Sequence, residues 1–465
     1  MKKILSILLA GCFALTAISC DDFLTEEPST SIPDEAAFLS AQDYVNAMNG
    51  VYYTLGTYRF LGRDVLAIGD VPSDLALHSA ATTHFYNLFT YQILETNSYL
   101  EEIWAYGYYA IDRSSRIIQA GLTASGTETD MATINQNIAQ AYGTRALATF
   151  YLTNIYGLPY SDNNKSTLGV VNVSEPIAAF AKVERATVEE NYKHVLSDIS
   201  KAKEYFAKEN VEDVDNVKMN KAAVAALEAR VKLYMKDYDG AIAAASEAIS
   251  LRNGKIVSTV IDYQKMYKEL TISSEDIFVI AKSETDYLSA NALSTLYGTY
   301  GVSVRKEVIA EFTSEDIRLS LLGGEWAGGK MGGITGNDQV QNLPVFRLPE
   351  MYLTLAESYA AKADYKEAKK FLLEVAAKRN PALDVAAIKE DATIIQIINK
   401  ERKLELCQEG HRFFDARRLG EKINVSDNTY KNYDVAKFVY PIPVAEVNTG
   451  FGVEQTKGWD TNLPK

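Results

Sequence analysis

The residues that could bind a metal or act as nucleophiles are few, and their spacing does not fit such chemistry. The four histidines (78, 84, 194 and 411) have no HExxH or other metal-ligand spacing. No G-x-S-x-G sequence offers a serine nucleophile. A carboxylate pair for glycoside hydrolysis would leave no spacing signature, because any two of the 61 acidic residues could meet in space. The sequence therefore favours a binding protein over an enzyme, and predicts no metal and no cofactor.

One glycine-rich span, 324–330, fits the pattern G-x-x-x-x-G-K of a phosphate-binding loop. Met331 stands where Ser or Thr should bind magnesium, and no strand-like run leads into the span. We therefore interpret 323–333 as an irregular loop rather than a nucleotide site. Because long insertions on a helical scaffold often carry binding function, Trp326 in this loop is a candidate ligand contact.

The aromatic residues are the feature of the sequence that favours a particular binding function. Between Tyr52 and Tyr109 they number 13 in 58 residues, about twice the 11% of the whole chain. A tyrosine ring has a flat apolar face and a hydroxyl at its edge, which suits sugars and also extended peptides. Trp104, Tyr108 and Ile111 fall at helical spacing and are predicted to be core residues.

A second group of aromatic residues follows a loop-like stretch, 79–83, and is predicted to be exposed. It comprises the rings at positions 84–86. An aspartate and an asparagine nearby could hydrogen-bond to hydroxyl groups, although the same residue types also form turns and caps. The candidate ligand-binding residues are Asp74, His84, Phe85, Tyr86, Asn87 and Trp326.

The N-terminus is typical of an export signal. Lys2 and Lys3 precede an uncharged and mostly apolar run over 4–18, which is too short to be a spanning helix. Small residues that end in Cys20 resemble a bacterial lipobox, which predicts removal of residues 1–19 and lipidation of Cys20. The alternative is an ordinary secretory signal followed by an unrelated cysteine.

The other two cysteines argue against a disulfide. Cys12 leaves with the signal, so Cys407 is the only thiol left beside the lipidated one. Cys407 lies within the charged motif 401–418, on a helical face with Ile398 and Leu404, and is predicted to be buried. The many acids and bases of this motif are predicted to form a structural ion-pair network that joins two helices.

Helical patterns separated by Gly, Pro and Asn dominate the rest of the chain. Long helices are predicted over 134–155 and 187–206, the latter with Thr187 as its cap and Glu190 completing a capping box. The predicted fold class is mainly α, with tetratricopeptide-like helical repeats and an irregular, loop-rich ligand-binding part. The predicted parts of this one compact unit are the signal (1–19), a tether (20–35), an N-terminal helical-repeat part (36–252), an irregular insertion (253–345) and a C-terminal helical part (346–465).

Two segments, 225–251 and 352–381, resemble each other and approximate tetratricopeptide spacing. Small residues at matching points, Ala229 and Ala241 in the first and Ala356 and Ala368 in the second, would let two antiparallel helices approach closely. A plain antiparallel helix bundle is the alternative.

The net charge of the chain argues against nucleic-acid binding. The chain carries 47 basic and 61 acidic residues, a formal net charge of −14, and its pI is about 5.0. No basic stripe is available for phosphates, so a nucleic-acid partner is not predicted. No apolar run after the signal is long enough to span a bilayer, so the protein is predicted to be anchored to a membrane and folded in water.

Taken in order, several motifs resemble those of the SusD/RagB family of outer-membrane lipoproteins from Bacteroidetes. The resemblance covers nearly the whole chain and includes CDDFLTEEP at 20–28, RA to YGLP at 145–159, RLPEMYLTLAE at 347–357, EGHR to DARR at 409–418 and YPIP at 440–443. Gln408 departs from the family, which more often has an apolar or aromatic residue there. These motifs look structural, so they transfer no ligand contact to this chain.

The resemblance implies tetratricopeptide-type helix pairs that support a less regular ligand surface. It also implies a lipid-anchored protein on the cell surface that covers a SusC-like TonB-dependent transporter and captures an oligosaccharide for import. Two alternatives stay open: a RagB-like lipoprotein that captures peptides, and a scaffold whose repeats contact only protein.

The lipidation prediction is tested by fractionation. We expect wild-type protein in the membrane fraction and labelled by a radioactive fatty acid, and we expect Cys20→Ala to abolish the label, because no thiol is left to carry acyl chains. Globomycin blocks cleavage after the thiol is lipidated, so it should accumulate a larger precursor that retains residues 1–19 and stays in the membrane. Wild-type protein that is fully soluble would exclude the anchor.

Overall fold

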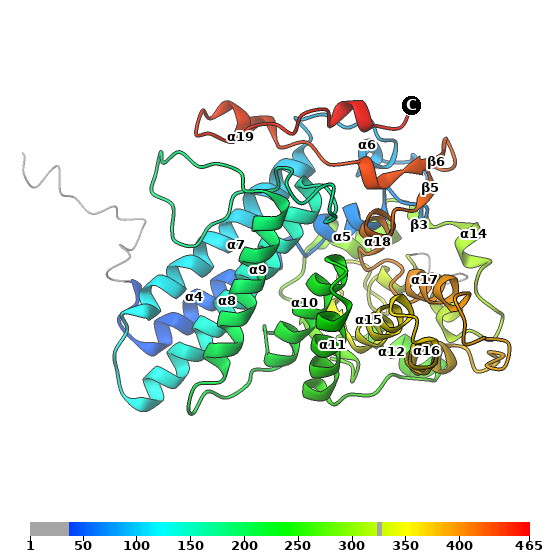
Figure 1. Cartoon of the computed structure of the whole chain (residues 1–465), viewed down its shortest axis with the longest axis horizontal. Coiled ribbons are helices and arrows are strands. Elements are labelled where there is room, and N and C mark those ends of the chain that lie inside the picture. Colours follow the sequence, from blue (N-terminus) through cyan, green and yellow to red (C-terminus); the bar gives the residue numbers. More distant parts are fainter. Residues whose placement is uncertain (1–36, 323–327) are drawn as a thin grey trace, which may run out of the picture.

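The computed structural model describes residues 37–322 and 328–465, and Figure 1 shows a mainly helical chain. The predicted fold class is confirmed. The predicted signal, the tether, the lipidation site Cys20 and the candidate Trp326 lie outside the described residues.

Four long helices lie side by side in the N-terminal part (Figure 1). They are α4 (Ala41–Leu55), α7 (Ser98–Leu122), α8 (Glu128–Tyr156) and α9 (Val188–Phe206). At the start of α9 the Glu190 N–H donates to the Thr187 hydroxyl at 3.2 Å, and the Thr187 N–H donates to the Glu190 carboxylate at 2.8 Å. This reciprocal cap satisfies two backbone donors. The helices predicted over 134–155 and 187–206 are confirmed, and α8 begins earlier than predicted.

Two helix pairs repeat one local design. The first is α10 (Lys221–Tyr234) with α11 (Tyr238–Arg252), and the second is α15 (Leu348–Ala361) with α16 (Tyr365–Arg379). In each turn a residue with positive φ, Lys236 at 61° or Ala363 at 62°, precedes an aspartate that caps the next helix. The alanines predicted to permit close approach are fully buried. Because α11 also packs against α15, the pairs stack on each other as repeats do.

Short elements fill the segment between the two pairs. The helical ones are α12 (Val260–Lys268), η1 (Ser289–Asn291), α13 (Leu293–Gly298), α14 (Lys306–Ile309), η2 (Ile317–Leu321) and η3 (Gly329–Met331). The named strands form three antiparallel pairs within the described ranges: β1 (Ala76–His78) with β3 (Val302–Val304), β2 (Asp276–Ile280) with β4 (Leu343–Arg347), and β5 (Lys422–Val425) with β6 (Tyr430–Asp434). The β1–β3 pair joins the segment before α7 to the segment after α13.

The remaining named elements lie outside the long N-terminal helices, the two helix pairs and the segment between those pairs. They are α5 (Asp64–Asp70), α6 (Tyr86–Phe89), α17 (Ile394–Glu405), α18 (Arg412–Leu419), η4 (Val435–Lys437), α19 (Val444–Asn448) and η5 (Asp460–Asn462). α5 contacts α18, and Gly69 lies so close to Gly410 that a Cβ at Gly69 would come within 2.0 Å of the Gly410 carbonyl oxygen. The C-terminal segment, at the top of Figure 1, returns to the residues before α7, where the Trp459 indole donates to the Glu95 carboxylate at 3.1 Å.

The predicted ion-pair network is confirmed and is larger than predicted. Arg402 on α17 pairs with Asp415 on α18 at 2.9 Å, as expected for a motif that joins two helices. A second cluster surrounds Glu405, which is fully buried and accepts from Arg379 and Arg347, each at 2.9 Å. The other members of this Glu405 network are Glu275, Glu409, Arg318, Lys330, and the two further partners of Arg318, Asp316 and Glu401.

Lys330, the last residue of the glycine-rich span, and Cys407 both have structural roles. The Lys330 ammonium is buried, 2.5 Å from the Glu409 carboxylate, and it also donates to the Glu405 carbonyl oxygen at 2.7 Å. Such a lysine is already engaged and does not present a free cation to a phosphate. Cys407 is buried as predicted, and burial raises the pKa of its thiol to about 12.

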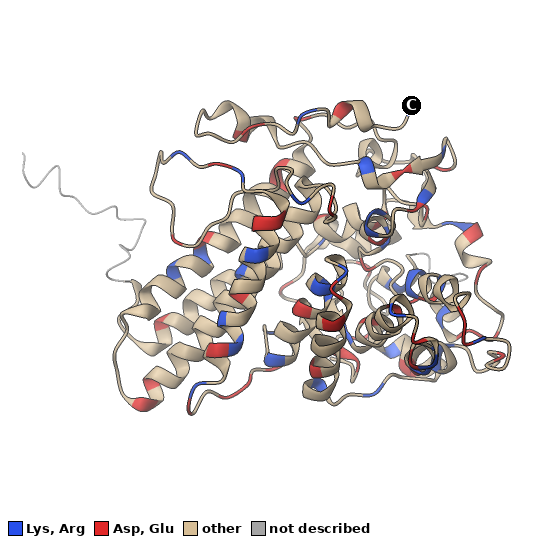
Figure 2. Cartoon of the chain, viewed as in Figure 1, with Lys and Arg blue, Asp and Glu red and all other residues tan. Residues whose placement is uncertain are grey.

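Charged residues of both signs are spread over the helices. Figure 2 shows Lys and Arg interspersed with Asp and Glu. Across 37–322 and 328–465, no helix is both long enough and apolar enough to cross a bilayer.

We expect Glu405→Ala to lower the free energy of unfolding by about 3–5 kcal/mol, because it leaves buried guanidinium groups without their carboxylate. Burial alone would raise the pKa of Glu405, but Arg379 and Arg347 outweigh it and hold the pKa well below the ordinary value of 4.5. The ion pairs of Glu405 therefore stabilise the fold at pH values above this ordinary pKa. Their contribution to the free energy of unfolding is lost as the pH falls below it. Urea unfolding at neutral pH measures the loss.

A matched control is Glu367→Ala, which removes the exposed pair with Lys370. We expect it to change the free energy of unfolding by less than about 0.5 kcal/mol. Equal effects of the two substitutions would contradict a central role for Glu405.

Candidate ligand-binding site

The β1–β3 pair brings together aromatic rings that are far apart in the sequence. His78 is opposite Val302 in the register, so the loop that follows β1 lies against the turn that precedes β3. There the imidazole of His84 stacks on the phenol of Tyr300, with ring centroids 4.1 Å apart and planes 15° apart. Both side chains are half-buried, which leaves part of the stack accessible to solvent.

His78 holds this loop in place. Its Nδ1 accepts from the Ala80 N–H at 3.0 Å, so Nε2 carries the proton and donates to the His84 carbonyl oxygen at 2.7 Å. The His78 ring also meets the Tyr86 ring edge-on, with centroids 5.2 Å apart. A buried histidine with both nitrogens bonded fixes the positions of residues 80–86 relative to β1.

The prediction that Phe85 is exposed is wrong. Its side chain is 1% exposed, and its ring stacks on Tyr99 of α7 with centroids 4.0 Å apart. Phe85 has φ 58°, in the left-handed region, and this conformation turns its ring toward α7 while its two neighbours stay half-buried. Phe85 is therefore a core residue beneath the site.

Asp74 is engaged by another side chain. Its carboxylate accepts from Arg412 at 2.6 and 2.9 Å. Burial opposes ionisation, but the Arg412 guanidinium outweighs it and lowers the pKa of Asp74. Asp74 thus joins its segment to α18, and this structural role leaves its predicted ligand contact without support from the geometry.

Asn87 and Tyr86 differ from Phe85 in exposure. Asn87 is exposed and Tyr86 is half-buried, so both remain candidates. Trp326 lies outside the described residues and stays a prediction. The structure adds Tyr300, which the sequence analysis missed because 216 positions separate it from His84 and only the strand pairing brings them together.

The rings of the site are uncharged at neutral pH. Burial, with the nearby cation of Arg63, lowers the pKa of His84 below its ordinary value, so its imidazole is neutral. Burial raises the pKa of Tyr99, which keeps that phenol protonated. Neutral flat rings with hydroxyl and imidazole edges suit a ligand that has an apolar face and hydroxyl groups.

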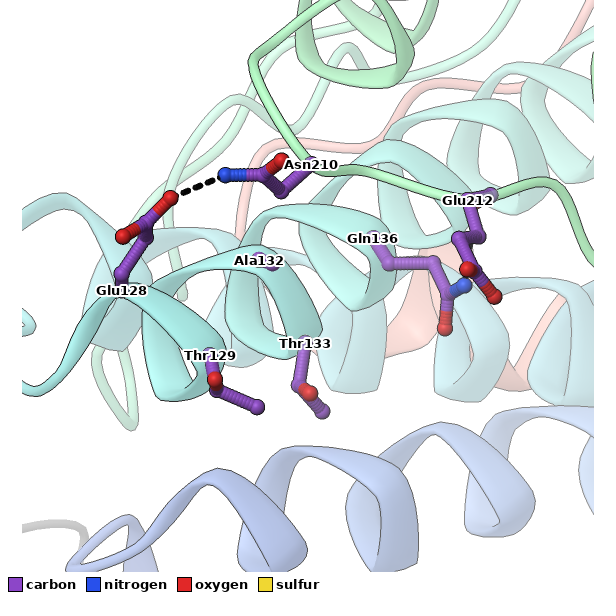
Figure 3. Close-up of a pocket in the computed structure, with 7 residues that line it drawn as sticks. All are labelled: Glu128, Thr129, Ala132, Thr133, Gln136, Asn210 and Glu212. Atoms are coloured by element: carbon purple, nitrogen blue, oxygen red, sulfur yellow. Dashed lines mark hydrogen bonds between the residues drawn. The ribbon is translucent and has the colours of Figure 1, made fainter.

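One cavity elsewhere on the described surface fits a sugar less well. A cavity of about 450 Å³ lies between the first turns of α8 and residues 210–212, and Figure 3 shows the polar side chains around it. None of the residues lining it carries an aromatic ring on which a sugar could stack: they are Glu128, Thr129, Ala132, Thr133, Gln136, Asn210 and Glu212. No group of three or more His, Cys, Asp or Glu within 37–322 and 328–465 is arranged to hold a metal ion.

Comparison with known proteins points to one family. A family model described as "Starch-binding associating with outer membrane" matches residues 22–233, and a second, described as "SusD family", matches residues 325–459. SusD-like protein P2 of Formosa agariphila is 29% identical over 197 residues. That match covers 41% of this chain and 36% of the relative, so it spans about a third of the relative's length.

Solved structures agree over most of the chain. A putative sugar binding protein from Bacteroides vulgatus has 26% identity and a TM-score of 0.82, covering 91% of this chain and 99% of its own. A SusD superfamily protein from the same organism has 24% identity and a TM-score of 0.80, covering 91% and 100%. The two family models and these solved structures together show that the chain resembles the SusD/RagB family over most of its length, as its motifs predict.

The burial of Phe85 gives a direct test. We expect Phe85→Ala to lower the free energy of unfolding by about 3–5 kcal/mol, because it leaves a cavity against Tyr99. Asn87→Ala, two positions away and exposed, should change it by less than about 0.5 kcal/mol. Urea unfolding of the two variants measures the difference, and equal stability would contradict the packing described for Phe85.

Proposed function

We propose that this protein is a cell-surface lipoprotein that binds oligosaccharides and delivers them to a SusC-like TonB-dependent outer-membrane transporter, without altering them. The observation that carries the proposal is the half-exposed stack of two neutral rings, His84 on Tyr300, in a SusD-type fold. Ring faces of this kind stack on the C–H face of a sugar, and the exposed amide of Asn87, three residues after His84, can hydrogen-bond to hydroxyls.

The descriptions of related proteins support a sugar rather than a peptide. One family description speaks of starch binding in association with the outer membrane, and one structural relative is described as a putative sugar binding protein. The lipobox ending in Cys20 supports attachment to a membrane, and the net charge of −14 is compatible with a protein that faces outward from the cell.

We expect the chain from Asp21 onward to bind at least one member of a panel of neutral oligosaccharides, as measured by isothermal titration calorimetry. Tyr300→Ala should weaken that binding about two- to tenfold, because it removes one stacking face. Chromatography of the ligand after incubation should recover it unchanged.

The same experiment separates the alternatives. Binding of oligopeptides and not of glycans would show that the ligand is a peptide and not a sugar. Recovery of a cleaved glycan would show that the protein is an enzyme. Co-purification of a TonB-dependent transporter with the lipidated protein from outer membranes tests delivery, and its absence would contradict the transporter partnership.

A further inference from the structure

An apolar turn projects from the long connection between α8 and α9. Residues 177–180 have the sequence Ile-Ala-Ala-Phe, and all four are exposed. Phe180 is 84% exposed and Ile177 is 39% exposed. In Figure 1 this connection forms a wide loop beside the long N-terminal helices, next to the segment that carries α19. We name residues 177–180 the apolar tip.

The loop that carries the apolar tip is held at both ends. Before the tip, the buried Arg145 guanidinium donates to the Ser174 carbonyl oxygen at 2.7 Å. After the tip, the buried Arg185 guanidinium donates to the carbonyl oxygens of Gly169 at 2.6 Å and Glu454 at 2.9 Å. Because buried charged donors fix both ends, the exposure of the tip is a built feature of the loop.

The C-terminal segment supports the apolar tip. The Val183 N–H donates to the Phe451 carbonyl oxygen at 2.7 Å, and the ring centroids of Phe180 and Phe451 are 6.0 Å apart. Phe180 has φ 63°, in the left-handed region that a bulky side chain rarely adopts. The Ala181 N–H closes the turn by donating to the Ala178 carbonyl oxygen at 3.1 Å. The chain thus adopts a costly backbone conformation at its most projecting ring, as is common where function requires it.

The charges near the apolar tip do not attract an anionic surface. The exposed charged residues of the loop are two acidic residues, Glu175 and Glu184, and one basic residue, Lys182, which sum to −1. The whole chain has a formal net charge of −14. Attraction to acidic lipids or to an acidic protein would need an excess of basic residues. Binding by the tip must therefore come from burial of its apolar surface.

The apolar tip is too small to form a protein interface by itself. A stable interface takes about 20–30 residues from each partner, whereas the tip offers residues 177–180 alone. A bilayer needs no complementary surface, because an apolar side chain is stabilised wherever it enters the boundary between headgroups and acyl chains. A short, projecting and uncharged turn therefore fits a bilayer better than a protein partner.

The length of chain before the described residues places a bilayer within reach. Cys20, the predicted lipidation site, and Ala37, where the described residues begin, are 17 positions apart. A chain of this length spans at most about 60 Å, and a compact domain of this size has a radius of gyration of about 22 Å. The anchor would therefore keep the domain at the bilayer without fixing its orientation. A second contact, although weak by itself, would fix that orientation because the anchor keeps it close.

We propose that the apolar tip inserts into the interfacial layer of the membrane that holds the lipid anchor, so that the protein contacts the bilayer both at Cys20 and at Phe180. The inference goes beyond ligand capture, and it rests on the anchoring part of the proposed function. Insertion would turn the connection between α8 and α9 toward the bilayer and give the helical body one fixed orientation on the membrane.

The test places a fluorescent reporter at the tip. The chain from Asp21 onward, with an N-terminal histidine tag, is held on phosphatidylcholine vesicles by a nickel-chelating lipid, so the result does not depend on native lipidation. Ala179→Cys is labelled with nitrobenzoxadiazole. Cys407 stays unlabelled, because it is buried and burial raises the pKa of its thiol to about 12. We expect a blue-shifted emission and quenching by lipids that carry a nitroxide on the acyl chain.

A matched control carries the same dye at Ala386→Cys, an exposed alanine in the loop between α16 and α17, at the opposite side of the molecule in Figure 1. Its emission should not be quenched. In the Ala179→Cys protein, Phe180→Asp should reduce the quenching at least about fivefold, because a carboxylate opposes insertion, and Phe180→Leu should retain it. Neither substitution at Phe180 should change the midpoint of urea unfolding, since the ring is exposed.

Failure of the tip is distinguishable from failure of the anchor. Equal quenching at the two dye positions, no quenching at either, or an unchanged signal with Phe180→Asp would contradict insertion. Quenching only on vesicles that contain phosphatidylglycerol would contradict an apolar mode of binding. Self-association in sedimentation velocity that Phe180→Asp abolishes would show that the tip meets a second copy instead. If Cys20 carries no fatty-acid label, the anchor and the two-point contact are both wrong; if it is labelled and the tip is not quenched, only the tip is wrong.

Discussion

Burial of the Glu405 carboxylate constrains much of this fold. A charge that is removed from water loses its hydration, and it is tolerated only when several donors replace that hydration. Here the donors come from Arg379 on α16 and Arg347 at the end of β4, with Arg318 in η2 completing the set. The repeat helices and the short elements between them must therefore come together for any of these charges to be compensated. This explains how a segment with little regular structure is held firmly against a helical scaffold.

Buried carboxylates that are compensated by several donors also lie near the candidate ligand-binding site. The Asp70 carboxylate at the end of α5 accepts from the backbone N–H groups of Gly410 at 2.7 Å and Arg412 at 3.2 Å. Asp74, four residues on, pairs with the Arg412 side chain. These bonds hold the chain just before β1 against α18, and the strand that follows places His84 beside Tyr300. Buried polar contacts therefore fix the backbone that carries the half-exposed stack of His84 on Tyr300, as a preorganised binding surface requires.

Local signals in the sequence predicted the features that depend on neighbours along the chain. The cap at Thr187 and the repeated alanines follow from spacing within one or two helices, and the burial of Cys407, which lies just after the end of α17, follows from its apolar neighbours. The site could be predicted only in part, since Tyr300 reaches His84 through a strand pair that no local pattern indicates. The loop-like neighbours of Phe85 predict a surface position, whereas its left-handed φ directs the ring toward α7.

Charge gives a reason why a ligand of this proposed site should be neutral. The net negative charge of the chain repels anions over distances of the order of the Debye length, and the imidazole of His84 in the proposed site is neutral. Affinity must then come from many weak ring contacts rather than from a few strong ion pairs. Several modest contacts along an extended chain can be broken one after another, whereas one strong ion pair must be broken in a single step. A protein that captures a ligand in order to pass it on is better served by the first arrangement, because the ligand can leave progressively as a partner takes hold of its other end.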